Sequence, residues 1–509
     1  MGRAALLSIV VGVVGVVGVA GCGRLGFGED GPTTLRTCAD AKRANQPTGI
    51  TTLDPDGSGE LAARDVWCDQ DRSGGGWALA LKIDGAQPTF AGTSTVWSDV
   101  TLVDAGNLDP AAPGEAKLAP YVDTAFAEVL LVVEGGGEVV VPLRAPSLRS
   151  AMASGLTLPT SVAEADWRAA FGMTSLETGC RRQGLGLQGD PALPRGVRLG
   201  ILANTETTEC RSAESFVGIG GNVPCPDGTV LAAGAASSIA GDAGALCKPA
   251  RVLVFVRDDD RTHLGAAASC KDHLAAGHSE SGVYLVGDPA VPTRCEMTIG
   301  GGGWTAALDF DALRDPCPAG WQPVAAAGPG CTVVDGAQIS GVSIAPPLAS
   351  YREVMTTLLA FQRGTADGYE GQGSIDDAYL DGLSITVGTP RQHVASYAVG
   401  YDEATGCNMM GACTCPCLGG IAAPAFAPEA ARRCEAGALS VSIDGTVVFA
   451  DPLFDGVELP AACAGEGRAE PIQTLLGGAT SDPIEARLMR NEIVQAEGLV
   501  LSRLELWVR

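Results

Sequence analysis

Residues that could carry out catalysis do not fall into any familiar arrangement in this sequence. The 509 residues include only four histidines, and no pair of them forms a His-Glu-x-x-His zinc motif. No serine lies in a Gly-x-Ser-x-Gly turn, and no Gly-Lys-Ser/Thr triplet could hold a phosphate. His393, close to Arg391, is interpreted as a structural residue that hydrogen-bonds a loop, since a general base needs a positioned partner. We therefore expect that the protein is not an enzyme.

Acidic side chains at alternate positions could instead bind calcium. Segment 54–60 imitates the start of an EF-hand loop, but Asp65 stands where a bidentate glutamate is needed and the flanking residues predict strands. We interpret this segment as a hairpin turn. Asp451 and Asp455 bracket another turn and could share one divalent ion with Asp381; an ordinary turn is the alternative.

The composition limits the classes of protein to be considered. Hydrophobic residues make up 46% and charged residues 18% of the chain, which is enough to form cores for two domains. Lysine and arginine total 34 against 59 acidic residues, for a net charge of -25. Such a charge repels phosphate backbones, so nucleic-acid binding is not expected.

The N-terminus predicts export. Arg3 is followed by an apolar run from Leu6 to Ala20, and small residues lead to Cys22. This segment resembles a bacterial lipoprotein signal, which implies cleavage before Cys22 and acylation of its thiol. A transmembrane helix is the alternative, but the run is short for a span and contains helix-weakening glycines. We therefore expect a signal peptide over 1–21, a lipidated linker over 22–37, and anchoring at the outer membrane or cell surface of a bacterial envelope.

The cysteines predict a disulfide framework. The chain has 17 cysteines, and setting Cys22 aside leaves an even number in an exported protein. The cluster of Cys407, Cys413, Cys415 and Cys417 could suggest a thiolate metal site. However, no Cys-x2-Cys pair is present and Pro416 lies within the run, so disulfides are favoured.

One short pattern occurs twice along the chain. The first copy contains Cys38, Cys68, Asp69, Gly74, Gly75, Gly76 and Trp77, and the second contains Cys270, Cys295, Glu296, Gly301, Gly302, Gly303 and Trp304. The acid and the tryptophan have the same spacing in both copies. Glycine runs between short alternating strands permit positive φ in a tight turn, so the pattern predicts β-structure in which each tryptophan anchors a small core. Phosphate binding is disfavoured because no lysine-bearing helix follows.

The first copy matches the Cys-Asp-x4-Gly-Gly-Gly-Trp signature of the C-terminal domain of fibrinogen and related lectins; the second has Glu296 for the aspartate. The chain thus resembles fibrinogen-like proteins twice. The resemblance implies disulfides between Cys38 and Cys68 and between Cys270 and Cys295. Cys317 and Cys331 are also expected in disulfides. Two sets of pairings stay open, namely those of Cys180, Cys210, Cys225 and Cys247, and those of Cys407, Cys413, Cys415, Cys417, Cys434 and Cys463.

The resemblance also sets the expected domains. From 38 to 257 the chain is similar to intelectin-type and bacterial fibrinogen-like domains, ending in a strand over 252–257. A short polar linker is expected over 258–269. The second unit, 270–509, departs from the fibrinogen pattern after Trp304 and then resembles a cysteine-rich module of secreted animal proteins. That likeness implies an extracellular setting and no particular activity.

Calcium is the one cofactor that the resemblance implies, because fibrinogen-like lectins use it to order loops or to coordinate sugar hydroxyls. In intelectin-like relatives the sugar site precedes the last strand, which corresponds to Asn204, Glu206 and Glu209 here. The histidine that such relatives offer to the sugar is missing from this segment. A solvated polar loop is the alternative.

These observations predict an α+β protein of two disulfide-stapled fibrinogen-like units, rich in short antiparallel strands, turns and loops. The expected function is binding of carbohydrate or another extracellular ligand at the cell envelope, with calcium as a candidate aid. The expected partners are the membrane, through the N-terminal lipid, and a glycan or surface protein. The alternative is an envelope scaffold or protein adhesin without a small ligand.

Overall fold

The fold was analysed in a computed structural model of the chain. The structure describes residues 35–57, 59, 61–154, 158–160, 162–173, 176–177, 180–188, 195–205, 213–237, 246–324, 330–334, 337, 339–363, 368–369, 375–376, 380–401, 423–437, 442–443, 446–447, 471–490 and 498–509.

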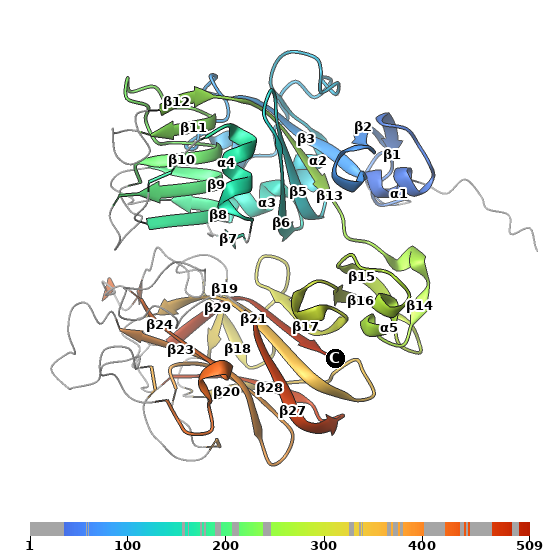
Figure 1. Cartoon of the computed structure of the whole chain (residues 1–509), viewed down its shortest axis with the longest axis vertical. Helices are drawn as coiled ribbons and strands as arrows, with labels where there is room; N and C mark the ends of the chain where they lie inside the picture. The colour runs from blue at the N-terminus through green and yellow to red at the C-terminus, as the bar shows by residue number, and fades with distance from the viewer. Residues whose placement is uncertain are drawn as a thin grey trace, which may run out of the picture.

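Two antiparallel sheets form the first half of the chain, which is the upper half of Figure 1. The larger sheet has, in spatial order, β1 (Gly49–Leu53), β2 (Arg64–Asp69), β3 (Trp77–Asp84), β13 (Arg251–Arg257), β5 (Phe126–Val133) and β6 (Glu138–Ala145), with β4 (Ala116–Lys117) beside β3. The smaller sheet has β12 (Leu246–Pro249), β11 (Ala233–Ser237), β10 (Ser215–Ile219), β9 (Gly196–Asn204), β8 (Cys180–Gln188) and β7 (Leu158–Pro159).

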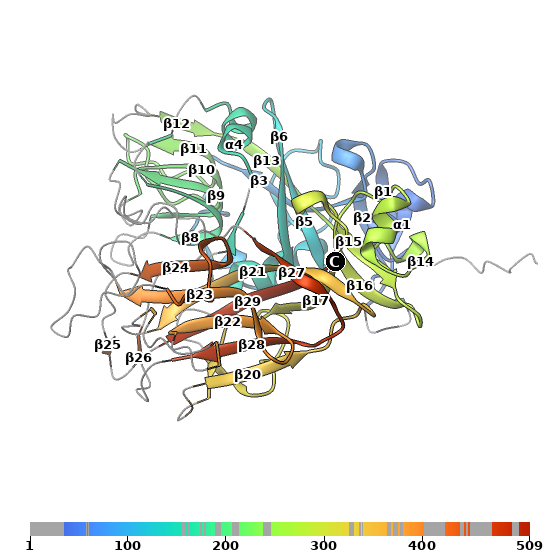
Figure 2. The same cartoon turned by 60° about the horizontal axis from the view of Figure 1, so that its bottom comes forward.

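Two further sheets dominate the second half, below the first in Figures 1 and 2. The larger one contains β14 (Ala266–Ala267), β15 (Gly282–Val286), β16 (Val291–Glu296), β17 (Trp304–Asp311), β29 (Gly498–Val508), β19 (Gly330–Val333) and β18 (Trp321–Val324), while β21 (Tyr351–Arg363) pairs with both β29 and β27 (Ile472–Thr480). The other contains β20 (Ile339–Ile344), β28 (Ile484–Met489), β22 (Gly382–Val387), β23 (Gln392–Tyr401) and β24 (Arg432–Gly437). A small hairpin joins β25 (Ser442–Ile443) to β26 (Thr446–Val447).

This architecture is mostly β, so the expected α+β class is wrong. The described α-helices are short: α1 (Cys38–Arg43), α2 (Ala119–Asp123), α3 (Leu148–Ala153), α4 (Glu164–Phe171) and α5 (Cys270–Ala275). The longest, α4, has eight residues, and no helix in the described part of the chain is long and apolar enough to cross a membrane. The physical reason is the period of the apolar pattern: buried and exposed positions alternate along β6 and β15, as a sheet requires.

Each half buries its core between its two sheets. In the first half, Leu81 of β3 lies in one buried cluster with Leu199 of β9 and Val217 of β10. In the second half, a corresponding cluster joins Leu506 of β29 to Leu488 of β28. The two sheets of the second half pack directly on each other as a sandwich, whereas in the first half helices α3 and α4 contact strands of both sheets and contribute to the shared core.

A row of glycines crosses the smaller sheet of the first half. Gly184, Gly200, Gly218 and Gly234 are successive cross-strand neighbours on β8, β9, β10 and β11. A Cβ on Gly200 would lie 2.0 Å from the Val217 carbonyl oxygen, and the φ of Gly200 is +158°. Close approach of the backbones thus requires glycine at this row.

Candidate functional site

The first copy of the repeated pattern is a disulfide-bonded helix and hairpin. Cys38, in the first turn of α1, is bonded to Cys68 of β2, with 5.3 Å between their Cα atoms. Thr37 caps α1, its hydroxyl accepting from the Asp40 N–H at 3.1 Å. β2 pairs with β1 and then with β3, where Asp69 lies opposite Trp77. The disulfide that the resemblance implied is present, and it fixes the helix against the hairpin.

Residues 69–77, here called the first signature turn, are shaped by hydrogen bonds to an acidic side chain. The Asp69 carboxylate accepts from the N–H groups of Asp71 and Arg72, both at 3.0 Å. Gly75 has φ +69°, and a Cβ there would lie 2.3 Å from the Gln70 carbonyl oxygen. The glycine run therefore serves the positive-φ turn that the sequence predicted.

Trp77 and Arg257 stabilise the first signature turn by hydrogen bonds and by stacking on each other. The Trp77 indole N–H donates to the Arg72 carbonyl at 2.9 Å, and the Arg257 guanidinium lies 4.1 Å above the indole ring. Arg257, at the end of β13, also donates to the carbonyls of Ser73 and Gly75 and pairs with Glu128 of β5 at 2.6 Å. This arrangement combines a cation–π contact with charge-assisted hydrogen bonds.

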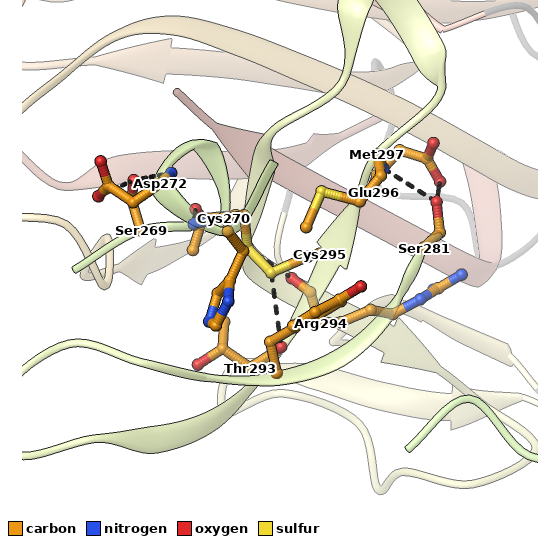
Figure 3. Close-up of a disulfide and its surroundings, with 12 residues drawn as sticks. Ser269, Cys270, Asp272, Ser281, Thr293, Arg294, Cys295, Glu296 and Met297 are labelled. Atoms are coloured by element: carbon orange, nitrogen blue, oxygen red, sulfur yellow. Dashed lines mark hydrogen bonds between the residues drawn. A yellow bond between two sulfur atoms is a disulfide. The ribbon is translucent and has the colours of Figure 1, made fainter. Parts of the chain in front are cut away.

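The second signature turn, residues 296–304, repeats these contacts, and Figure 3 shows the disulfide at its start with Ser281 beside Glu296. Cys270 of α5 is bonded to Cys295 of β16, and the Glu296 carboxylate accepts from the N–H groups of Thr298 and Ile299 at 2.7 and 3.0 Å. Ser281 donates to the other oxygen of Glu296 at 2.9 Å. The longer Glu296 thus fulfils the role of Asp69.

Trp304 and Arg509 close the second signature turn. The Trp304 indole N–H donates to the Ile299 carbonyl at 2.8 Å, and the Arg509 guanidinium lies 4.1 Å above its ring. Arg509 pairs with Glu353 at 2.8 Å, and hydrogen bonding to Arg509 holds the pKa of Glu353 below its usual range. The polar groups described above in both turns make hydrogen bonds or ion pairs with other residues of the chain. We therefore interpret the turns as structural elements that offer little to a ligand.

A cavity of about 390 Å³, broadly open to solvent, adjoins the first signature turn. It lies between the β5–β6 turn, the start of β6 and helix α4, and is lined by Gly136, Gly137, Glu138, Val139, Val140, Val162, Asp166, Ala169 and Ala170. The Glu138 carboxylate accepts from the Arg72 guanidinium at 2.6 Å and from the Ser73 hydroxyl at 3.1 Å. Asp166, in the first turn of α4, is exposed. The cavity therefore presents one oriented and one solvent-facing carboxylate beside valine and alanine side chains.

The predicted calcium ligands are not brought together by the described residues. Asn204 is buried at the end of β9, where its side-chain oxygen accepts from the Thr205 N–H at 2.9 Å. Glu206, Glu209, Asp451 and Asp455 lie outside the described residues, as does Cys22. Within the described part, one group has the spacing of metal ligands, namely Cys225, Asp227 and Cys247. Its two cysteines are joined to each other in a disulfide, which leaves only one ligand free.

Two buried lysines of the first half of the chain donate hydrogen bonds to loop oxygens. The Lys117 ammonium donates to the carbonyls of Val96 and Asp99 at 2.6 and 2.8 Å, and to the Asp99 carboxylate at 2.6 Å. The Lys82 ammonium donates to Asn107 at 2.6 Å and to the Asp109 carbonyl at 2.7 Å; burial lowers the pKa of Lys82. Oxygen atoms of segment 96–112 thus accept hydrogen bonds from the ammonium groups of Lys82 and Lys117.

His393 does not have the surroundings of a general base. Burial lowers its pKa to about 4, so the imidazole is neutral at pH 7. Among the described residues neither ring nitrogen has a hydrogen-bond partner, so the expected hydrogen bond to a loop is not seen; the ring lies 5.8 Å from that of Phe426. The strands on either side of segment 54–60, β1 and β2, pair antiparallel, as the hairpin interpretation requires.

Two further disulfides are present. Cys317 pairs with Cys331, both of which were expected in disulfides, and Cys225 pairs with Cys247, a pairing that the sequence left open. Cys434 is also disulfide-bonded. Sequence reasoning missed Arg257 and Arg509. The available signal was the similarity of their preceding residues, Phe255-Val256 and Trp507-Val508.

The disulfides place the protein in an extracellular or otherwise oxidising compartment, where such bonds persist. A scan against models of known protein families finds no match to this chain, and a search of curated proteins finds no significantly similar sequence.

Proposed function

We propose that the protein is an exported, lipid-anchored binding protein of the bacterial envelope, whose fibrinogen-like units recognise carbohydrate or another surface ligand. The observation that carries this proposal is the cavity between β6 and α4. Its volume of about 390 Å³ is within the range of small-molecule sites. Carboxylates accept hydrogen bonds from sugar hydroxyls, and the side chains of Val140 and Ala169, which are not buried, can pack against the apolar face of a sugar ring.

The repeated Cys-acid-glycine-Trp pattern supports the assignment to fibrinogen-like units, because both copies adopt the same disulfide-bonded hairpin and signature turn. The signal-like segment ending at Cys22 supports export and acylation. A multiply acylated cysteine would hold the protein on a membrane without a spanning helix. Labelling with a radioactive fatty acid that requires Cys22, and is lost in Cys22→Ser, would support the anchor; equal labelling of both would contradict it.

In this proposal Glu138 binds the ligand directly, with its carboxylate oriented by Arg72 and Ser73. Calcium stays a candidate cofactor for Asn204, Glu206 and Glu209, where it would act on the segment before the last strand of the first unit.

The experiment that tests this function is binding of the oxidised protein to a diverse glycan array, with calcium and again with a chelator. Binding to a restricted set of glycans supports the proposal, and its loss in chelator assigns a role to calcium. Silence under both conditions, for protein shown to be folded, contradicts a lectin and favours the scaffold or protein-adhesin alternative.

A further inference from the structure

The second unit repeats the whole central sheet of the first and not only its opening hairpin. The order β1-β2-β3-β13-β5-β6 in the first unit corresponds to β15-β16-β17-β29-β21-β27 in the second, and every neighbouring pair is antiparallel. Both sheets have a break in strand register at the same place. The residue skipped in the pairing is Ala80 in β3 and Ala307 in β17, and each lies three positions after the tryptophan of its own unit.

Buried side chains follow the same correspondence. One small cluster of the first unit contains Trp77, Leu130 and Phe255, and one of the second unit contains Trp304, Met355 and Trp507. Phe255 lies opposite Leu130, as Trp507 lies opposite Met355. The two units therefore have residue-by-residue equivalents far beyond the signature turns.

At one pair of equivalent positions, the two units have side chains of opposite charge. Lys82 and Asp309 each lie five positions after the tryptophan of their unit. Lys82 is fully buried and binds the loop oxygens of its own unit. Asp309 instead lies within 3.4 Å of Arg294 and 3.5 Å of Arg314, and it also pairs with Arg144 of β6, in the first unit.

Apolar contacts accompany this ion pair. Leu359 and Phe361 of β21 and Val500 of β29 belong to the buried cluster that forms the core of the first unit. Their exposed fractions are 2 to 4%. The first unit thus covers a surface of the second unit, and this surface includes the charged residue Asp309.

We infer that the central sheet of residues 270–509 is a duplicate of the central sheet of the first unit, in which the position of Lys82 has become Asp309, a docking residue that accepts Arg144 and fixes the two units together. The partner for this surface is the first unit of the same chain. Arg294 and Arg314 orient the Asp309 carboxylate, so that Arg144 meets a preformed acceptor.

Small-angle scattering of the chain from residue 22, with Cys22→Ser in place of the lipid, tests this inference. The wild type is expected near the roughly 23 Å radius of gyration of a compact chain of this length. Arg144→Glu places two carboxylates together and is expected to increase the radius, while Lys42→Glu, the same change of charge on exposed α1, leaves it unchanged.

A rescue variant separates docking from general damage. In Arg144→Glu combined with Asp309→Asn the repulsion is removed and the new carboxylate faces Arg294 and Arg314, so the wild-type radius is expected to return. An unchanged radius in Arg144→Glu overturns the inference, as does an increase that Asp309→Asn does not reverse. If Arg144→Glu alone fails to fold, a folded and compact double variant supports the inference and a double variant that also fails contradicts it.

Discussion

Arg257 and Arg509 each stabilise a signature turn from the far end of their unit. Each is the residue that follows the last buried valine of the closing strand, and each stacks on the tryptophan while donating to turn carbonyls. A guanidinium is suited to this because its planar fork can stack and donate together.

Arg257→Ala is expected to lower the free energy of unfolding by about 2 kcal/mol, because it removes a cation–π contact and hydrogen bonds from a charged donor. Urea denaturation measures the change. Arg36→Ala, at an exposed position, is the control and is expected to change stability by less than about 0.5 kcal/mol. Equal effects of the two substitutions would show that the stacked arginine contributes nothing specific.

Asp309 makes the free energy of unfolding depend on pH in the acidic range. Burial alone would raise its pKa, but Arg294, Arg144 and Arg314 outweigh this and hold the pKa below its usual range. A folded-state pKa below the unfolded value of about 3.9 gives stability that is complete above that pH and is lost as the pH falls through the folded value.

The difference in unfolding free energy between wild type and Asp309→Asn is therefore expected to be constant from pH 7 to about pH 5 and to shrink below about pH 4. Urea titrations over this range measure it. A difference that stays constant down to about pH 2 would contradict the ion-pair account of Asp309.

Residues in one continuous pattern were the easiest to predict. Cys68, Asp69 and Trp77 are close in sequence, so their shared turn could be expected from glycine chemistry and the family resemblance. Arg257 joins the same site from a distant strand, and the only signal for it was the similarity of the residues that precede Arg257 and Arg509. The cavity acids Glu138 and Asp166 were missed for the same reason, since only the fold brings β6 beside α4.

At the scale of elements, the glycine row of the smaller first-unit sheet controls how closely β9 and β10 approach. Gly218→Ala is expected to lower the unfolding free energy by about 3 kcal/mol, since its Cβ would lie 2.1 Å from the Leu199 carbonyl oxygen and its φ is +142°. Differential scanning calorimetry measures the loss. Gly106→Ala, which meets nothing within 4 Å, is the control; an equal loss there, or none at Gly218, would contradict the packing argument.

The α+β fold class expected from the sequence was wrong. The short apolar runs, such as Leu130 to Val133 in β5, instead pair into extensive sheets. A sheet is built from contacts between distant segments, and the pairing of β29 with β21 links positions more than a hundred residues apart.

At the scale of the whole molecule, the chain consists of two docked copies of one sheet architecture, of which the sequence indicated only the shared beginning. The later strands have diverged, and some strands between β17 and β29 form a second sheet whose order differs from that of the sheet between β3 and β13. The cavity between β6 and α4 belongs to the first unit. In the proposed function, the first unit therefore binds the ligand and the second unit supports the first.

The most direct test of the proposed function is the affinity of the protein for the glycans selected on the array, compared between Ala169→Phe and Ala165→Phe. Both alanines are exposed on α4, but only Ala169 lines the cavity. Filling the cavity with Ala169→Phe is expected to weaken binding at least about ten-fold, which corresponds to about 1.4 kcal/mol, whereas Ala165→Phe leaves it unchanged. Undiminished binding by Ala169→Phe would show that the ligand does not enter this cavity and would contradict the account.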